Sequence, residues 1–318
     1  MRKSTIIHAG ILLLVFAAAA EASSLDQGIA LLRSGDPAAA EETLAPLAPA
    51  GTNSRLLFNL GLAQVRLGKF DQAIDSLEKA VKIHPTSDEY YWLGVAYGLK
   101  TMRANVVHKA FLAHHIHNNF ERAIEMNPDH LDARFALMLY DVMAPGFMGG
   151  GVDRAVDQAR EIQKRDPARG YDAWATILQH QKKYAQAKQK YQEAIERYPD
   201  DPRPHYWLAM FDANRNEYDA AFAELENAVR ISPGYMPAWF GIGKVASRSG
   251  RNLERGEKAL QKYLDYRPTY TEPDLATARW LLAEIYAHEG KEALARTESR
   301  RAAHSAPPLT KIAGNLGR

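Results

Sequence analysis

Apolar residues in this chain recur three or four positions apart, in units of 34 residues. That spacing places them on one face of a helix, and residues 54–87 show it most completely. The recurrent positions of this unit are Leu57, Leu60, Gly61, Gln64, Gly68, Phe70, Ala73, Leu77, Ala80 and Pro85. The pattern predicts two antiparallel helices joined at Gly68, and Pro85 ends the second because proline cannot continue a helix.

The small residues of this unit suit a close crossing of its two helices. Gly61 and Ala73 are expected at that crossing, and Ala80 is expected where the second helix meets the next unit. Leu77 then fills the space between them. Short helices of this kind are marginal alone, so stacking of successive units must hold them together.

The same unit recurs along most of the chain. Full copies occupy 168–201, 202–235, 236–270 and 276–309, and a weaker copy near the N-terminus contains Gly28, Gly35, Ala40 and Leu44. The order of Leu-Gly, turn glycine, aromatic residue, alanines and terminal proline resembles the tetratricopeptide repeat superfamily. The resemblance implies an all-α fold over residues 23–309, a right-handed solenoid of antiparallel helix pairs with about eight repeats.

Two units within residues 88–167 depart from the period. The first has extra residues in 100–114, without proline or glycine, and we expect them to lengthen the helices of that pair. In the second, Pro145 is predicted to end a helix and 144–151 to form a flexible loop, with a lid over the groove as the alternative. Residues 88–170 resemble a group of exported proteobacterial tetratricopeptide proteins.

The N-terminal 22 residues have the pattern of a secretory signal peptide. Arg2 and Lys3 precede an apolar run over 6–20, and Ala20-Glu21-Ala22 forms a small-x-small cleavage site. The alternative is an uncleaved anchor, but the run is short for a membrane-spanning helix. We therefore expect a periplasmic or secreted protein without stable membrane insertion after cleavage. The tail at 310–318 is expected to be flexible.

Composition narrows the chemistry further. The chain has no cysteine, which excludes disulfides, thiolate metal sites and a cysteine nucleophile. The formal net charge of +2 is too near neutral to predict nucleic acid as a partner. The sequence predicts no cofactor and leaves the oligomeric state open.

The superfamily lines its concave face with the first helix of each pair. The resemblance therefore places aromatic and polar side chains of this sequence in a groove, where rings can anchor a peptide and basic groups can hold a carboxylate. The alternative for each ring is a place in the core, since these positions lie between groove and core. The predicted groove residues are Phe58, Arg66, Tyr91, Trp92, His180, Tyr206, Trp207, Asn214, Phe240, Lys244, Arg248 and Trp280.

Four histidines form the only candidate metal site. His108, His114, His115 and His117 lie within ten residues, and imidazoles bind zinc, copper or nickel. However, His114 and His115 point about 100° apart on a helix, which favours a solvated helix face instead. No sequence motif of a hydrolase, phosphate-binding loop or dinucleotide site is complete.

These observations favour a non-catalytic periplasmic scaffold that binds a peptide or another envelope protein in its concave groove. The alternative is a small-ligand-binding accessory protein of an envelope transport system. In that case a closed pocket would lie beside Tyr91, Trp92 and the loop at 144–151.

Overall fold

The computed structural model describes residues 22–50, 53–102 and 104–305, and within these ranges every regular element is a helix. The predicted signal peptide, apart from its last residue, and the predicted tail at 310–318 lie outside the described residues. None of the helices in the described ranges has the length and apolar character needed to cross a membrane.

The helices pair in chain order, and the pairs stack on one another. A helix over 22–33 precedes α2, and the last pair is α15 and α16. The predicted all-α solenoid of about eight antiparallel helix pairs is confirmed. The elements after the first helix are α2 (Pro37–Leu44), η1 (Ala45–Ala50), α3 (Ser54–Arg66), α4 (Phe70–Ile83), α5 (Ser87–Thr101), α6 (Val106–Met126), α7 (Leu131–Met143), η2 (Gly146–Met148), α8 (Val152–Arg165), α9 (Pro167–His180), α10 (Tyr184–Arg197), α11 (Pro202–Asn214), α12 (Tyr218–Ile231), α13 (Met236–Ser249), α14 (Leu253–Leu264), α15 (Leu275–His288) and α16 (Glu292–Ser305).

Polar side chains fix the start of several inner helices. Asn53, Thr86 and Asp274 each accept a hydrogen bond from a backbone N–H in the first turn of α3, α5 and α15. These N–H groups have no partner within the helix, so the caps stabilise each start by about 1 kcal/mol. The unit boundaries are therefore set locally by sequence.

Small residues lie where the two helices of a pair cross. A methyl group added to Gly61 would come within 2.6 Å of Leu77, and one added to Gly243 would come within 2.2 Å of Leu260. Ala73 and Ala80 are fully buried. The predicted close crossing at Gly61 is confirmed, because no larger side chain fits against Leu77.

The two irregular units differ from the prediction in detail. Helix α6 has 21 residues where α4 has 14, whereas α5 ends at Thr101 and a turn follows, with Asn105 as the N-cap of α6. The extra residues thus lengthen the second helix rather than both. Asparagine at an N-cap competes with helix continuation, so the stretch 100–114 does not form one helix.

The glycine-rich loop at 144–151 is held by specific bonds. Pro145 ends α7 as predicted, and the hydroxyl of Tyr140 donates to the carbonyl of Met148. The N–H of Gly151 donates to the carbonyl of Asp141 at 2.8 Å. The loop contacts α6, the second helix of the preceding pair, and its Phe147 is 79% exposed. The sequence predicted a flexible loop from its glycines, whereas in the structure these hydrogen bonds hold the loop against α6.

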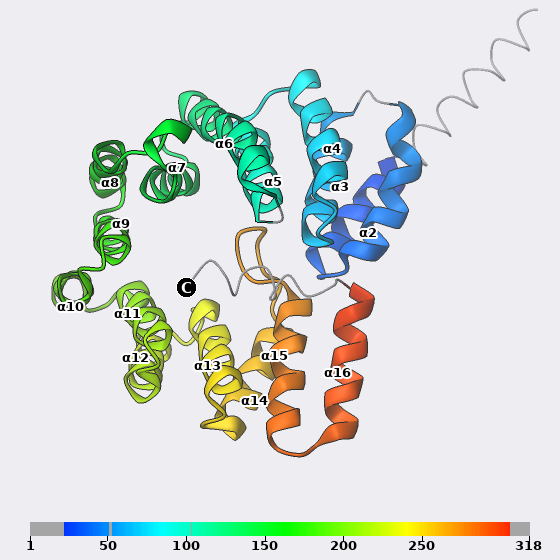
Figure 1. The fold of residues 1–318 in the computed structure, drawn as a ribbon. Coiled ribbons are helices and arrows are strands. Elements are labelled where there is room, and N and C mark those ends of the chain that lie inside the picture. Colours follow the sequence, from blue (N-terminus) through cyan, green and yellow to red (C-terminus); the bar gives the residue numbers. More distant parts are fainter. Residues whose placement is uncertain (1–21, 51–52, 103, 306–318) are drawn as a thin grey trace, which may run out of the picture.

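The stack bends into a closed ring, which the sequence pattern did not predict. From α5 to α13 the first helices of successive pairs line its inside (Figure 1), and from α7 to α15 neighbouring first helices contact one another. Helix α16 packs against α2, and Leu275 at the start of α15 lies against Gly35. The loop between α14 and α15 projects into the middle of the ring (Figure 1).

Candidate functional site

The inside of the ring has two regions with different surroundings. On α3, beside Trp92 of α5, the concave face is covered by the chain's own loop 265–274, which we call the docked loop. On α11 and α13 the concave face carries Lys244 and Arg248, both exposed to solvent. Both regions contain residues that the sequence predicted for the groove.

The docked loop has an ordered shape of its own. The carboxylate of Glu272 accepts hydrogen bonds from the N–H of Thr269 at 2.7 Å and from the hydroxyl of Tyr266 at 3.0 Å. The hydroxyl of the fully buried Tyr263 donates to the carbonyl of Pro273 at 2.7 Å. These bonds close the loop on itself, so it meets α3 in a preformed shape.

The tip of the docked loop bonds to α3. The hydroxyl of Tyr270 donates to Oδ1 of Asn59 at 3.2 Å, and Arg66 donates to the carbonyl of Thr269 at 3.4 Å. The guanidinium carbon of Arg66 lies 6.0 Å from the centre of the Tyr270 ring, at the outer limit of a cation–π contact. Arg66 is only 7% exposed. This predicted groove residue is therefore already engaged by the chain itself.

Apolar packing accompanies these bonds. Tyr270 packs against a buried cluster formed by Leu32, Ala40, Leu62 and Ala63. Phe58 and Trp92, two further predicted groove residues, pack against the same cluster. Both rings therefore share this region with Tyr270 of the docked loop.

The second region is a surface that we call the basic patch, formed by Tyr206, Met210 and Asn214 of α11 with Lys244 and Arg248 of α13. A methyl group added to Gly241 of α13 would lie 3.4 Å from the Tyr206 ring and 3.3 Å from Met210. Arg248 donates to Oδ1 of Asn214 at 3.3 Å. The structure therefore brings four of the predicted groove residues, Tyr206, Asn214, Lys244 and Arg248, onto two adjacent helices.

The charges of the basic patch are not balanced. Within the described residues neither Lys244 nor Arg248 forms an ion pair. Lys244 lies inside the ring, and partial desolvation, together with the charge of Arg248, lowers the pKa of its ammonium group. A carboxylate bound here would relieve both effects.

Acidic and phenolic groups lie beside the basic patch. Burial raises the pKa of Tyr206 to about 12, and the carboxylates of Asp172 and Glu272 contribute in the same direction. Burial also raises the pKa of Asp172 to about 6, opposed by a hydrogen bond from the Tyr191 hydroxyl at 3.0 Å and by the charge of Arg169. Glu272 belongs to the docked loop.

Two predicted groove residues pack against neighbouring rings. Phe240 is 5% exposed and its ring centre lies 5.1 Å from that of Tyr263, so it offers no surface to a partner. Tyr91 is half-buried, and its ring centre lies 6.0 Å from that of Phe120 and 5.0 Å from that of His130. The cause in both cases is the neighbouring helix, which the repeat pattern does not specify.

The remaining predicted groove residues are separate from the basic patch. The Trp207 ring lies 5.7 Å from the guanidinium of Arg203. Trp280 is half-buried, and its indole N–H has no hydrogen-bond partner in the described residues. His180 is exposed at the end of α9, and partial desolvation lowers its pKa.

The four histidines of α6 make separate contacts. His115 stacks on Tyr97 at 4.7 Å, His117 pairs with Glu121 at 3.1 Å, and His114 bonds to Asn118. His108 bonds to Asn105 at the helix start. No group of three potential ligands that could hold a metal ion occurs in the part of the chain that the structure describes. The helix face is therefore used for packing and capping.

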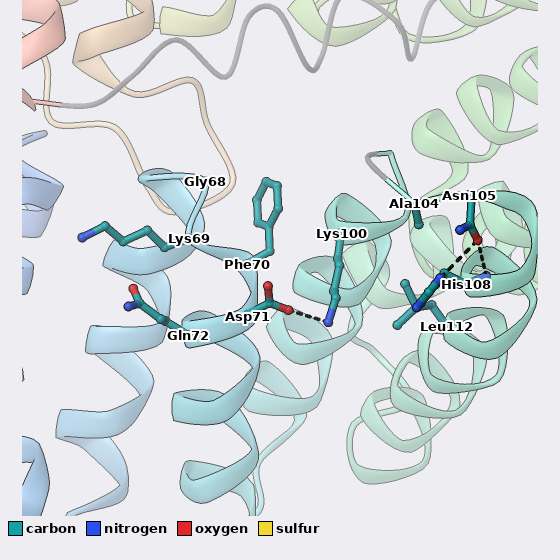
Figure 2. Close-up of a pocket in the computed structure, with 10 residues that line it drawn as sticks. All are labelled: Gly68, Lys69, Phe70, Asp71, Gln72, Lys100, Ala104, Asn105, His108 and Leu112. Atoms are coloured by element: carbon teal, nitrogen blue, oxygen red, sulfur yellow. Dashed lines mark hydrogen bonds and ion pairs between the residues drawn. The ribbon is translucent and has the colours of Figure 1, made fainter.

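A cleft of about 680 Å³ lies outside this face, between the start of α4 and the turn before α6 (Figure 2). Its lysines are already paired: Lys100 contacts Asp71 at 2.5 Å, and Lys69 contacts Glu41 at 2.5 Å. Sequence reasoning had not singled out this cleft. Nothing about its paired charges points to a particular ligand.

The sequence analysis also missed the docked loop, although a signal for it exists. Units 168–201, 202–235 and 236–270 follow one another without a gap, but five residues, 271–275, separate the last of these from the unit at 276–309. An insertion between units maps to a connecting loop. Its length indicates extra chain at that place, although not where the loop binds.

Comparisons with known proteins agree with the fold. The sequence model described as tetratricopeptide repeat matches residues 25–97, 173–235 and 240–309. A search of curated proteins gives no significant match. The irregular units fall largely in the gap between the first two matched segments.

Several solved structures are similar to this chain. Yeast Tom70 shares 14% identity over 87% of this chain with a TM-score of 0.55, and the match spans 58% of Tom70. A tetratricopeptide repeat protein of Parabacteroides merdae shares 18% identity over 83% of this chain and 98% of its own, with a TM-score of 0.46. YrrB, described as having an unusual peptide-binding site, shares 18% identity over 68% of this chain and 88% of its own, with a TM-score of 0.39.

At these identities the similar structures show the fold alone, and this chain spans a little over half the length of Tom70. The matched segments cover about two thirds of the chain and include both the docked loop and the basic patch. Repeats of this kind are in general non-catalytic scaffolds for protein–protein interaction. The chain belongs to the tetratricopeptide repeat family.

Proposed function

We propose that this chain is a non-catalytic interaction scaffold that binds an extended, carboxylate-bearing segment of another envelope protein at the basic patch. The observation that carries the proposal is the pair Lys244 and Arg248, one helical turn apart and without an ion pair in the described residues. Bringing two like charges together inside a ring is unfavourable unless a ligand compensates them.

The neighbouring side chains suit such a segment. Tyr206 and Met210 offer apolar surface next to the two cations, and the Asn214 amide can contact a peptide main chain. Some other cations have partners, such as Arg251 with Asp219 and Lys188 with Glu217, whereas Lys79 and Lys82 on the outer helix α4 form no ion pair in the described residues. What distinguishes Lys244 and Arg248 is that two cations without an ion pair lie one turn apart on the concave face, which this family uses for binding.

Crosslinking tests this proposal. A photoreactive amino acid at position 210, in full-length protein expressed in a bacterial envelope, is expected to capture a partner segment that mass spectrometry then identifies. Lys244→Glu should abolish the crosslink, because it replaces attraction by repulsion. Lys79→Glu makes the same charge change on the exposed face of α4 and should leave the crosslink intact. Equal crosslinks in both variants would remove the basic patch from the proposal.

Export is the second part of the proposal. It is supported by the positive start, apolar run and Ala20-Glu21-Ala22 site of residues 1–22. A fusion of residues 1–40 to a reporter that is active only outside the cytoplasm should be active. Deletion of residues 2–22 should abolish that activity, and a reporter that stays inactive with the intact segment would contradict export.

A further inference from the structure

The docked loop contacts α3 in the way that a bound peptide contacts a receptor. One side chain, Tyr270, inserts into an apolar cluster, and one main-chain carbonyl, that of Thr269, accepts a hydrogen bond. The partners lie 211 and 203 residues apart in sequence, so no repeat-to-repeat packing rule requires these contacts. Side-chain anchors combined with main-chain bonds are typical of peptide recognition.

The receptor side is positioned before the tyrosine arrives. The amide nitrogen of Asn59 donates to the carbonyl of Arg55 at 2.7 Å, which leaves Oδ1 free to accept from a phenol. Arg66 forms no ion pair in the described residues and directs its guanidinium to the ring and to the carbonyl before it. Together these groups select an aromatic residue with a hydroxyl, within a segment whose carbonyl is accessible.

The docked loop is also built to move as a unit. The bonds from Thr269 and Tyr266 to Glu272 are internal to the loop, and Tyr263 of α14 holds its end through Pro273; none of them involves α3. Its polar contacts with α3 are two hydrogen bonds at 3.2 and 3.4 Å. Each such bond contributes little net free energy, so the loop can leave α3 while keeping its own shape.

We propose that the docked loop is an internal ligand, and that the concave face of α3 and α5 beneath it is a binding site for an extended, tyrosine-bearing segment of a partner protein. The partner competes with Tyr270 for Asn59 and Arg66. This site uses residues separate from the basic patch, and it stands whether or not the basic patch binds a carboxylate.

The probe is a fluorescently labelled peptide with the sequence of residues 265–274, Asp-Tyr-Arg-Pro-Thr-Tyr-Thr-Glu-Pro-Asp. Anisotropy measures its binding to the mature full-length protein. The wild-type protein should bind it weakly, because a tethered loop competes at an effective concentration in the millimolar range. Tyr270→Ala should bind it about tenfold more tightly, since the internal competitor loses its anchor.

Three controls make the result specific. Thr271→Ala, at an exposed position of the same loop, should behave as wild type. Adding Asn59→Ala and Arg66→Ala to Tyr270→Ala should abolish the gain, and so should a peptide in which the residue matching Tyr270 is alanine. Lys244→Glu should leave peptide binding unchanged, which separates this test from that of the proposed function.

The outcomes decide the proposal. If Tyr270→Ala retains the helical circular dichroism of wild type but does not bind the peptide more tightly, the loop is only a structural clasp and the proposal is overturned. If Tyr270→Ala does not fold, Tyr270→Phe replaces it. Loss of the hydroxyl bond to Asn59 should then tighten peptide binding about threefold, and unchanged binding would overturn the proposal.

Discussion

The two regions of the concave face carry similar side chains, yet their surroundings differ. On α3, Arg66 is buried because the docked loop supplies an aromatic ring and a carbonyl to it. On α13, Lys244 and Arg248 occupy corresponding inner positions, remain exposed and have no ion-pair partner in the described residues. The position of a residue within its repeat places its side chain inside the ring. Whether that side chain is exposed depends on whether another segment, such as the docked loop, packs over it.

The comparison also shows two ways of compensating a charge. Arg66 is compensated by neutral groups, a π face and a carbonyl dipole, which suits a neutral segment. In the basic patch only Arg248 contacts a neutral acceptor, Asn214, and desolvation together with the charge of Arg248 lowers the pKa of Lys244, which suits an anionic segment. Variants that act on one region and leave the other unchanged test whether the two regions bind independently.

The largest expected effect is on the basic patch. Lys244→Glu combined with Arg248→Glu should weaken the affinity for the crosslinked partner segment about 100-fold, or about 3 kcal/mol, because attraction becomes repulsion in a partly desolvated site. Titration calorimetry measures it. Lys79→Glu with Lys82→Glu is the matched control on α4, and an equal loss there would mean that net charge alone governs binding.

The next largest effect concerns the contact of the docked loop with α3. Tyr270→Ala removes a packed ring and the bond to Asn59, and should lower the free energy of unfolding by about 2 kcal/mol. Hydrogen exchange should accelerate in α3 and the docked loop but remain unchanged in α11. Faster exchange throughout the ring would show instead that the two regions are coupled through the whole solenoid.

A smaller effect concerns the pH dependence of stability at Asp172, which lies near Tyr206 of the basic patch. The folded pKa of Asp172, about 6, lies above that of an unfolded aspartate, so the folded chain holds this proton more tightly. Its contribution to stability is full below about pH 4 and is lost as the pH rises through 6. Asp172→Asn should therefore stabilise the protein at pH 7.5, on the order of 1 kcal/mol, with little effect at pH 4.

Thermal unfolding of wild type and Asp172→Asn at both pH values checks this expectation. Asp172→Glu keeps the charge and serves as the control, which should not stabilise at pH 7.5. An equal gain from Asp172→Asn at both pH values would show that packing, rather than titration, produces the effect.

The smallest effect tests the corrected position of Phe240. Phe240→Leu should reduce stability by about 1 kcal/mol through poorer packing on Tyr263 and leave partner affinity unchanged. Chemical denaturation and calorimetry measure the two quantities. An affinity loss of tenfold without a change in stability would return Phe240 to the binding surface.

Much of the site could be predicted from sequence because the repeat fixes which helix faces inward. Tyr206, Asn214, Lys244 and Arg248 follow from that rule and from the 3.6-residue helical period. The exposure of Phe240 and Tyr91 depends on how closely Tyr263, Phe120 and His130 approach. Such distances depend on side-chain packing within and between helix pairs, which the spacing of residues along the sequence does not encode.

The sequence by itself determined the helices, their pairing and their order, since each depends on neighbours within one or two units: caps such as Asn53, turn glycines such as Gly68, and crossings such as Gly61 with Leu77. Only the tertiary structure decided that the ring closes and that Tyr270 reaches Asn59. The physical reason is that curvature is the sum of a small rotation at every unit. No single unit contains that sum, so contacts across the ring emerge only when all the rotations are added.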